Sequence, residues 1–431
     1  MNSQAVGLPA PSRSRWAVSR VRWWAMAALL VVAGGFAARH LWAWHHLSAA
    51  ETALAHYQND SALAHLEKCL SVWPDNVTAH VLAARAERRA GRATEAEEHI
   101  DLARKSAGAR ADAVAFEWSL LQAATGRLET VETQLQDRIK KSPAEAPLIW
   151  EALCVGYRRT YRMVEADNLL KTWLYFDPDN VQAHFLRGEA HRQLGADGLA
   201  IENYQRVVDL DPTHELARRY LARALVRRGR YKEAASHFEV LLRRSPDDPE
   251  LKTGLARSWR YLGRKEEAVA LLDAVLGDHP EYGPALRERG RAALAVEAFA
   301  DAEAWLRKAQ RALPYDYDTQ FALHQALNGL GRVEDAKTEL AVALLLKDRM
   351  ERVSEIQSKQ MTLTPFDAAL HAELGGLLLD LGQQDSAERW LHSALRLDPQ
   401  LASAHATLAR LYDEQGDVDR AARHRRLAAK K

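Results

Sequence analysis

Residues 181–214 read VQAHFLRGEAHRQLGADGLAIENYQRVVDLDPTH. Apolar residues recur at helical spacing in two stretches of this segment, and a turn near Gly195 separates them. The closing Leu-Asp-Pro ends the second stretch, because proline cannot continue a helix and disfavours helix in the residue before it. The segment therefore predicts a unit of two helices joined by a turn.

The landmarks of this unit return every 34 residues. Prolines and alanines are in register at Pro178, Pro212, Pro246, Pro280 and Pro314, and at Ala166, Ala200, Ala234, Ala268, Ala302 and Ala336. A fixed period of this length is the signature of a repeat architecture. One helix pair cannot bury its apolar stripe alone, so neighbouring pairs are expected to stack, each touching only its neighbours.

The unit resembles the tetratricopeptide repeat (TPR), a 34-residue helix-turn-helix that ends in proline. Small residues, here Gly188 and Ala200, occupy the places where the two helices approach closely. The large apolar place holds Tyr204, Phe238, Leu272 and Leu306 in successive units. The resemblance implies an all-α, right-handed superhelical solenoid with a concave groove, lined by the first helix of each unit, that binds other proteins.

The repeat frame divides the chain into three parts. Residues 1–22 are a basic tail, residues 23–44 a predicted transmembrane helix, and residues 45–431 a solenoid of about ten units. The units are predicted near residues 45–76, 77–110, 111–146, 147–180, 181–214, 215–248, 249–282, 283–316, 317–367, 368–401 and 402–431. The unit at 317–367 has 17 extra residues, which we interpret as an elongated second helix plus a turn.

The composition is that of a folded protein. Of 431 residues, 47% are hydrophobic and 27% charged, with 22 Gly, 14 Pro and 2 Cys, which excludes disordered, collagen-like and disulfide-rich classes. The net charge is +1, but residues 1–48 hold five arginines and no acid, which leaves 54 basic and 58 acidic residues in the body. This body lacks the basic excess of a nucleic-acid-coating protein, so no nucleic-acid partner is predicted.

A membrane anchor is predicted after the basic tail. The uncharged run from Trp23 to Ala38 would span about 24 Å as a helix, and extension to Trp44 gives about 33 Å, against about 30 Å for a bilayer core. Tryptophans flank the run on both sides, as interfacial anchors do. The arginines before the run predict a single-pass protein with a cytoplasmic N-terminus and an extracytoplasmic repeat body, periplasmic in a bacterium.

The same run has two alternative interpretations. A cleaved signal peptide has the same order of basic, apolar and small residues, with Gly35-Phe36-Ala37 as a passable cleavage site. The tryptophans on both flanks favour the anchor, because they have no role in a cleaved peptide. A buried first helix of the fold is disfavoured by the four arginines that precede the run.

No recognisable catalytic or metal-binding motif occurs. The sequence contains no GxxxxGK[ST], HExxH, GxSxG, CxxC or CxxCH, so neither enzymatic activity nor a cofactor is predicted. His45 and His46 have no further ligands at metal-binding spacing, which favours an interfacial or solvated role. Cys69 and Cys154 are predicted to be free core thiols, since units three apart do not touch.

Arginines recur on the first helices, at the places that line the groove in the TPR family. With one tyrosine, these candidate partner-binding residues are Arg85, Arg88, Arg89, Arg158, Arg159, Arg192, Arg219, Arg223, Arg227, Arg257, Arg260, Tyr261, Arg287 and Arg291. We call this set the arginine ladder. From residue 317 on, the corresponding places are largely neutral or acidic, as at Phe321, Glu373 and Asp380.

The guanidinium fork matches carboxylates and phosphates in two-point contacts, so the arginine ladder predicts a basic groove for an acidic ligand. The alternative is that these arginines are ordinary solvated residues paired with acids on neighbouring helices. The function predicted is a non-enzymatic, membrane-anchored scaffold or adaptor for an acidic extended or helical protein segment. A different possibility is a component of an envelope polysaccharide assembly or export system that binds an anionic glycan or its synthesis machinery.

Overall fold

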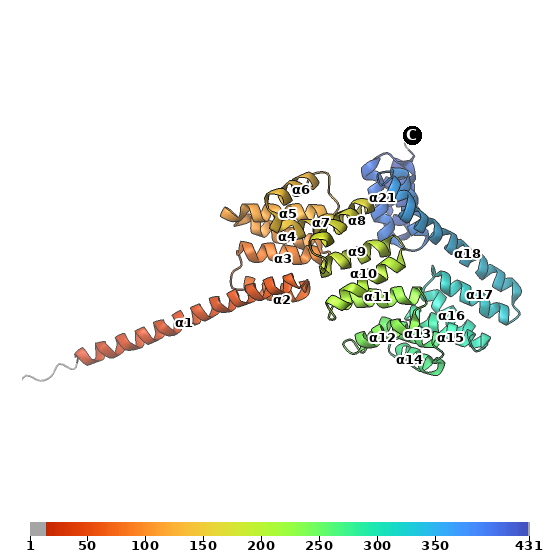
Figure 1. The fold of residues 1–431 in the computed structure, drawn as a ribbon, viewed down its shortest axis with the longest axis horizontal. Coiled ribbons are helices and arrows are strands. Elements are labelled where there is room, and N and C mark those ends of the chain that lie inside the picture. The colour runs from red at the N-terminus through yellow and green to blue at the C-terminus, as the bar shows by residue number, and fades with distance from the viewer. Residues whose placement is uncertain (1–13, 430–431) are drawn as a thin grey trace, which may run out of the picture. The chain divides into compact units, whose positions relative to one another are not determined.

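The computed structural model describes residues 14–429. All secondary structure in these residues is helical, which confirms the all-α prediction. The helices form two compact units, Met1–Lys141 and Ser142–Lys431 (Figure 1). Within each unit, most helices pack chiefly on the next helix along the chain, as stacked helix pairs require.

The first unit contains α1 (Ser14–Ala55), α2 (Asn59–Leu70), α3 (Val77–Arg89), α4 (Ala93–Lys105), α5 (Ala111–Ala124) and α6 (Glu132–Lys141), with a 3₁₀ turn at Gly108–Arg110. The second unit begins with a 3₁₀ turn at Pro143–Glu145. Its helices are α7 (Ala146–Arg159), α8 (Met163–Phe176), α9 (Val181–Gln193), α10 (Asp197–Leu210), α11 (Glu215–Arg227), α12 (Tyr231–Leu242), α13 (Pro249–Tyr261), α14 (Lys265–Asp278), α15 (Gly283–Leu294), α16 (Phe299–Ala312), α17 (Tyr317–Gly329), α18 (Val333–Glu355), α19 (Met361–Leu363), α20 (Ala368–Asp380), α21 (Gln384–Leu397), α22 (Ala402–Glu414) and α23 (Val418–Ala428).

The two helices of a repeat cross closely at a small residue. A Cβ atom at Gly188 in α9 would lie 2.6 Å from the ring of Tyr204 in α10. A Cβ atom at Gly290 in α15 would lie 2.5 Å from Cγ of Leu306 in α16. Both distances are too short for carbon atoms, and Tyr204 and Leu306 are fully buried. Only a small residue fits at this position of the first helix, because the large apolar residue on the second helix of the same repeat fills the adjacent space.

Polar contacts fix the entry into several of the first helices. The Asn180 side chain accepts a hydrogen bond from the backbone N–H of Ala183 at 2.9 Å and so caps α9. The His184 ring donates from Nε2 to the carbonyl oxygen of Pro178 at 2.9 Å. His371 and His405 make the same contact to Pro365 and Pro399. The proline that ends one repeat is thus tied to the first helix of the next.

First helices lie on the inner side of the curved array in the second unit. Helix α7 contacts α9, α11 contacts α13, α13 contacts α15, α15 contacts α17, and α20 contacts α22. Successive second helices, such as α10 and α12, are not in comparably close contact. Elements on the inside of a curve lie closer together than those on the outside, so the first helices line the concave side.

The second unit closes on itself, which departs from the expectation that each repeat touches only its neighbours. Tyr161 and Met163, at the α7–α8 turn, belong to one buried apolar cluster with Ile356, Met361 and residues of α20–α22. The Tyr161 and Trp390 ring centroids are 4.8 Å apart. We call this contact the seam; α8 and α21 lie beside each other there (Figure 1).

Tyr161 occupies an unusual place in the seam. Its φ angle is +56°, in the left-handed region that L side chains avoid, and the equivalent turn residue one repeat later is Gly195, with φ +69°. A left-handed conformation costs a bulky residue about 1–2 kcal/mol. The strain is offset by burial of the ring against Trp390.

The insertion after residue 346 returns the chain to the seam. Helix α18 runs for 23 residues, and a π-helical turn at Ile356–Gln360 leads into α19. Ile356 and Met361 are fully buried in the seam cluster. The elongated second helix predicted for residues 317–367 is observed, and its added length ends in the seam.

The predicted membrane anchor is wrong. Within the described residues, no helix has the combination of length and apolar character needed to cross a bilayer. The sixteen-residue uncharged run reaches the length of a bilayer core only if it is extended to Trp44. The added residues belong to the packed fold. Arg39 donates to the carbonyl oxygen of Ser71, and the Trp73 indole donates to His40. Ala43 is fully buried.

The correction applies to the transmembrane helix at residues 23–44 and to the single-pass membrane localisation. Helix α1 continues through the predicted boundary at residue 44 and ends at Ala55. The disfavoured alternative, a first helix that packs in the fold, describes its last turns, where Ala50 and Leu54 are buried. Most of the basic tail, residues 1–13, lies outside the described residues.

Candidate protein-binding surface

The arginine ladder follows the first helices of both units. Its members lie on α3 in the first unit and on α7, α9, α11, α13 and α15 in the second. In the second unit these helices form the inner side of the curve. The repeat period therefore brings side chains from five successive first helices to the inner face of the curve, because each first helix presents the same repeat positions to that face.

Most of these arginines bind an acid on the next first helix. We call this arrangement an arginine clasp. In the first unit, Arg85 and Arg88 of α3 donate to the two oxygens of Glu117 in α5, at 3.0 and 2.9 Å. Burial alone would raise the pKa of Glu117, but the charges and hydrogen bonds of the two arginines outweigh it and lower the pKa below its ordinary value.

Clasps of the same kind join helices of the second unit. Arg158 of α7 donates to Glu189 of α9 at 3.2 Å, and Arg260 of α13 donates to Glu288 of α15 at 3.0 Å. Further clasps bind Arg219 to Asp248 and Glu250, Arg287 to Asp316, and Arg291 to Asp318. The partners are 27 to 31 residues apart in sequence. Each clasp therefore ties one repeat to the next.

Three other members have different partners. Arg192 donates to Glu189 of its own helix at 2.9 Å, and Arg227 donates to Asp197 of the preceding repeat at 2.6 Å. Arg89 donates to the carbonyl oxygen of Leu54 and lies 4.3 Å above the Tyr57 ring. The alternative interpretation, in which the arginines pair with nearby acids, thus describes much of the ladder.

Arg223 and Arg257 are held less tightly than the clasp arginines. The guanidinium nitrogen of Arg223 is 3.3 Å from Glu250, and that of Arg257 is 3.9 Å from Glu288, without a hydrogen bond of good geometry. Tyr261 lies near Arg257 and is 47% exposed. These three residues retain donors and surface for a ligand.

Arg159 lies at the edge of the seam. Burial, followed by the positive charges of Arg389 and Arg158, lowers its pKa. Arg389 approaches from α21, so like charges face each other across the seam. The apolar contacts of the seam therefore form despite the repulsion between Arg159 and Arg389.

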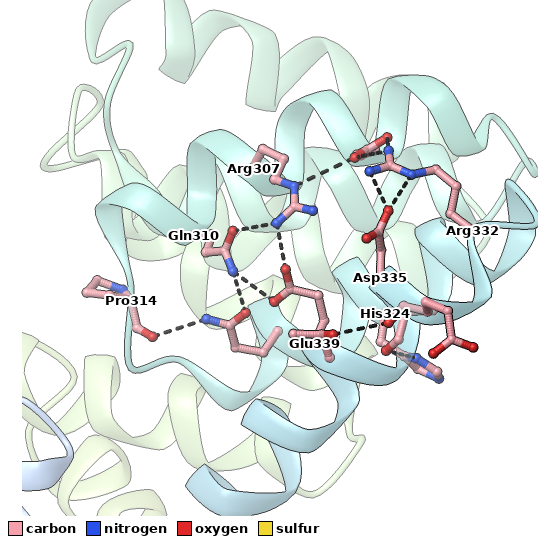
Figure 2. Close-up of polar contacts among 12 residues, drawn as sticks. Arg307, Gln310, Pro314, His324, Arg332, Asp335 and Glu339 are labelled. Atoms are coloured by element: carbon pink, nitrogen blue, oxygen red, sulfur yellow. Dashed lines mark hydrogen bonds and ion pairs between the residues drawn. The ribbon is translucent and has the colours of Figure 1, made fainter.

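Beyond the ladder, polar contacts also join second helices (Figure 2). Arg307 and Gln310 of α16 both donate to Glu339 of α18, at 2.6 and 2.9 Å. Arg332 at the start of α18 binds Glu303 at 2.7 Å and Asp335 at 2.8 Å. First helices are cross-linked here as well, since Arg410 of α22 donates to Asp380 of α20 at 2.7 Å.

The predicted core thiols are buried. Cys69 and Cys154 are free and fully buried, and burial raises the pKa of Cys154 to about 12, which makes it a poor nucleophile. His46 is buried as well, and its Nδ1 is 2.8 Å from Nδ1 of His65. This packing replaces the interfacial or solvated role expected for His46.

Sequence reasoning located the arginines but not the acids that hold them. Glu117, Glu189 and Glu288 were not singled out, although each is nearly or fully buried. A signal was present, because an acid follows each clasp arginine at about one repeat length. Comparison of charges across the 34-residue period, rather than within one helix, would have found these pairs.

Comparisons with known proteins agree with the repeat assignment. Two family models described as tetratricopeptide repeat match the chain, one at residues 53–116, 198–258 and 225–288, the other at residues 165–215. The rice protein "DnaJ protein P58IPK homolog B" (Oryza sativa subsp. japonica) is 30% identical over 166 residues, 35% of each chain. "DnaJ homolog subfamily C member 7 homolog" of Schizosaccharomyces pombe is 28% identical over 200 residues, 42% of this chain and 41% of that protein.

The similarity to these relatives is partial, since the chain spans well under half of their length. Among solved structures, "Crystal structure of PilW, widely conserved type IV pilus biogenesis factor" aligns with 45% of this chain and 90% of that chain, at 21% identity and a TM-score of 0.39.

Proposed function

Since residues 53–116 and 165–288 of the chain are tetratricopeptide repeats, we propose that it is a non-enzymatic scaffold or adaptor that binds an acidic protein segment, extended or helical, on its first helices. TPR proteins mediate protein–protein interaction. The observation that carries the proposal is the arginine ladder, which gathers basic side chains from five successive first helices on the concave side of the second unit.

The clasps support a binding surface as well as a structural role. They hold the guanidinium groups in fixed positions, and a fixed donor loses less conformational entropy when it binds a ligand. Helices α11 and α13 also present Arg223, Arg257 and Tyr261, which are less engaged than the clasp arginines. Arginine and tyrosine are enriched in protein interfaces.

A charge-reversal experiment tests this proposal. A variant of the 431-residue chain carries Arg219→Glu, Arg223→Glu and Arg257→Glu. The protein that this variant captures is compared, at low and high salt, with the protein that the unmodified chain captures. We expect the triple variant to lose the salt-sensitive fraction of captured protein, because like charges repel an acidic segment.

The matched control carries Arg230→Glu, Arg264→Glu and Arg332→Glu. These arginines begin second helices, are about as exposed as Arg223, and also pair with acids. Circular dichroism verifies that both triple variants remain helical. If the two triple variants capture equal amounts of protein, the surface formed by the first helices does not bind the partner.

A further inference from the structure

Three pairs of histidines join the two helices of a repeat. They link α1 to α2, α3 to α4, and α22 to α23. In chain order, the two Nδ1 atoms of a pair are 2.8, 3.1 and 2.9 Å apart, and the ring centroids are 5.0, 5.3 and 5.1 Å apart. The rings therefore meet at these nitrogen atoms instead of stacking. We call them the histidine pairs: His46–His65, His80–His99 and His405–His424.

A backbone carbonyl sets the tautomer in two of the histidine pairs. The Nε2 atom of His80 is 2.8 Å from the carbonyl oxygen of Pro74, which only accepts hydrogen bonds, so this nitrogen carries the proton. The Nδ1 atom of a neutral His80 then has a lone pair and accepts from the Nδ1–H of His99. His405 contacts Pro399 in the same way, at 3.1 Å, so the C-terminal pair has the same arrangement.

Each histidine pair has one hydrogen between its rings. A separation of 2.8–3.1 Å fits one N–H donor and one lone pair. One added proton is accommodated at Nε2 of the half-buried ring, whereas a second makes two N–H groups face each other and two like charges repel. The other ring of each pair is buried, with exposed fractions of 8%, 4% and 5% at His46, His80 and His405, so water screens this repulsion poorly. A second added proton therefore requires the rings to separate.

Basic side chains surround the first and the last histidine pair. Burial is the largest cause that lowers the pKa of His424, and four basic side chains of α21, α22 and α23 add to it: His405, His392, Arg423 and Arg420. Burial also lowers the pKa of His46, followed by the charges of His65, Lys68 and His45. The groups that act on these two histidines include no acid, so added protons are disfavoured at both pairs.

Two acids moderate the histidine pair of α3 and α4. Burial and then the charge of His80 lower the pKa of His99, whereas Glu87 of α3 and Glu98 of α4 act in the opposite direction. This pair should therefore open at a lower pH than the pair of α22 and α23.

A central repeat accommodates a proton at the same place. The Nδ1 atom of His184 faces Oδ1 of Asn203 at 3.4 Å, and its Nε2 faces the carbonyl oxygen of Pro178. Asn203 donates from Nδ2 to the carbonyl oxygen of Leu199 at 2.8 Å, which keeps its Oδ1 toward His184. Both ring nitrogens of His184 thus face acceptors, as a protonated imidazole requires.

We propose that the histidine pairs are an acid-sensitive device that opens the first two repeats and the last repeat of the chain while the central repeats stay closed. A second added proton enters a pair, the rings separate, and the two helices of that repeat come apart. Because the opened repeat binds one more proton than the closed repeat, its stability is full above pH about 6.5 and falls as the pH decreases below that value. In the last repeat, opening uncovers the Tyr412 ring, beside which Arg420 and His424 of α23 lie.

Hydrogen exchange of the 431-residue chain at pH 7.5 and 5.5 tests this device. Protection factors correct for the intrinsic pH dependence of exchange. We expect protection in residues 77–105 to fall about tenfold more than in residues 249–278, which contain no histidine, and protection in residues 402–428 to fall at least as much. Tenfold is the effect of one extra proton bound on opening, one pH unit below the ordinary histidine pKa of about 6.5.

His99→Gln isolates one histidine pair. The glutamine amide donates to His80 at neutral pH, and its oxygen accepts from His80 when that ring is protonated. This variant should keep its protection at pH 7.5 within about twofold and lose most of the fall in residues 77–105, while the fall in residues 402–428 remains. His424→Gln should give the reciprocal result. The control His56→Gln removes an exposed histidine of the first unit and should leave both falls unchanged.

Three results would overturn the device. One is a fall in residues 77–105 and 402–428 no larger than in residues 249–278, and another is a fall that His99→Gln and His424→Gln leave unchanged. The third is a loss of protection at pH 7.5 after dialysis against EDTA, which would show that the pairs hold a metal ion instead of a shared proton. If His99→Gln fails to fold, His424→Gln decides, since it lies in the other compact unit.

Discussion

The repeats of residues 181–316 and the seam are held by different kinds of contact. Between residues 181 and 316, buried side chains pack within their own repeat or the next, as in the cluster around Tyr204 and Phe238. At the seam, Tyr161 packs against Trp390, 229 residues further along the chain. Local contacts are renewed in every repeat, whereas the seam depends on one set of side chains. A substitution in the core of a repeat should therefore destabilise the whole second unit. A substitution in the seam should loosen only the segments that meet there.

The largest effect is expected from Tyr204→Ala. The side chain is fully buried and fills the space above Gly188, so its removal leaves a cavity between α9 and α10. We expect the free energy of unfolding to fall by about 3–5 kcal/mol, measured by guanidinium titration. Tyr175→Ala, at a ring that is 81% exposed, is the control and should change it by less than about 0.5 kcal/mol. A loss below about 1 kcal/mol for Tyr204→Ala would contradict the packing described.

A smaller and more local effect is expected from Trp390→Ala. The indole is partly buried against Tyr161 and His371, so its loss should cost about 2 kcal/mol at the seam. Hydrogen exchange should accelerate in residues 157–165 and 385–395 and stay unchanged in residues 215–290. Equal acceleration in all three segments would show that the seam and the repeats unfold together.

Tyr161→Gly separates the seam from backbone strain. Glycine adopts the left-handed turn without cost, so this variant relieves strain while it removes the ring. Its exchange pattern should match that of Trp390→Ala, with a smaller loss of total stability. Unchanged exchange at residues 385–395 would mean that the Tyr161 ring does not hold the seam.

The smallest effect is expected from pH, through His371 in the seam. Burial lowers its pKa, and Arg396 adds to this, while the hydrogen bond to Pro365 and the charge of Asp367 act in the opposite direction. Between its ordinary pKa of about 6.5 and the lower folded value, the unfolded chain binds more protons than the folded chain. Stability should therefore fall as pH decreases below about 6.5.

Other histidines with lowered pKa values, such as His237 in α12, contribute to the same trend, so a variant is needed to isolate the seam. His371→Gln should lose less stability than the unmodified chain between pH 7.5 and 5.5, by up to about 1 kcal/mol in thermal unfolding. An identical pH dependence would show that the pKa of His371 is the same in the folded and unfolded chains.

The sequence period predicted the apolar packing that recurs from repeat to repeat. The small residue at Gly188 and the large apolar residue at Tyr204 follow the 34-residue frame. The elongated helix before Ile356 is visible in the sequence as a departure from that frame. These features are local, because the residues that determine them lie within one repeat of each other.

The seam and the clasps were not predicted, for two physical reasons. Tyr161 replaces glycine at a turn, and nothing within its own repeat indicates that the ring meets Trp390. The arginines were recognised on their helices, but Glu288 lies on the next first helix, where a single-helix pattern does not connect them. The anchor was mispredicted because hydropathy alone does not show that Arg39 and His40 contact the segment that follows α2.

The closed second unit restricts how the protein can evolve. An open solenoid gains or loses whole 34-residue repeats freely, since every new neighbour resembles the old one. Here each added repeat would rotate α21 away from the α7–α8 turn by the angle of one unit and separate Trp390 from Tyr161. The number of repeats between these two residues is thus fixed by the geometry of the closed unit.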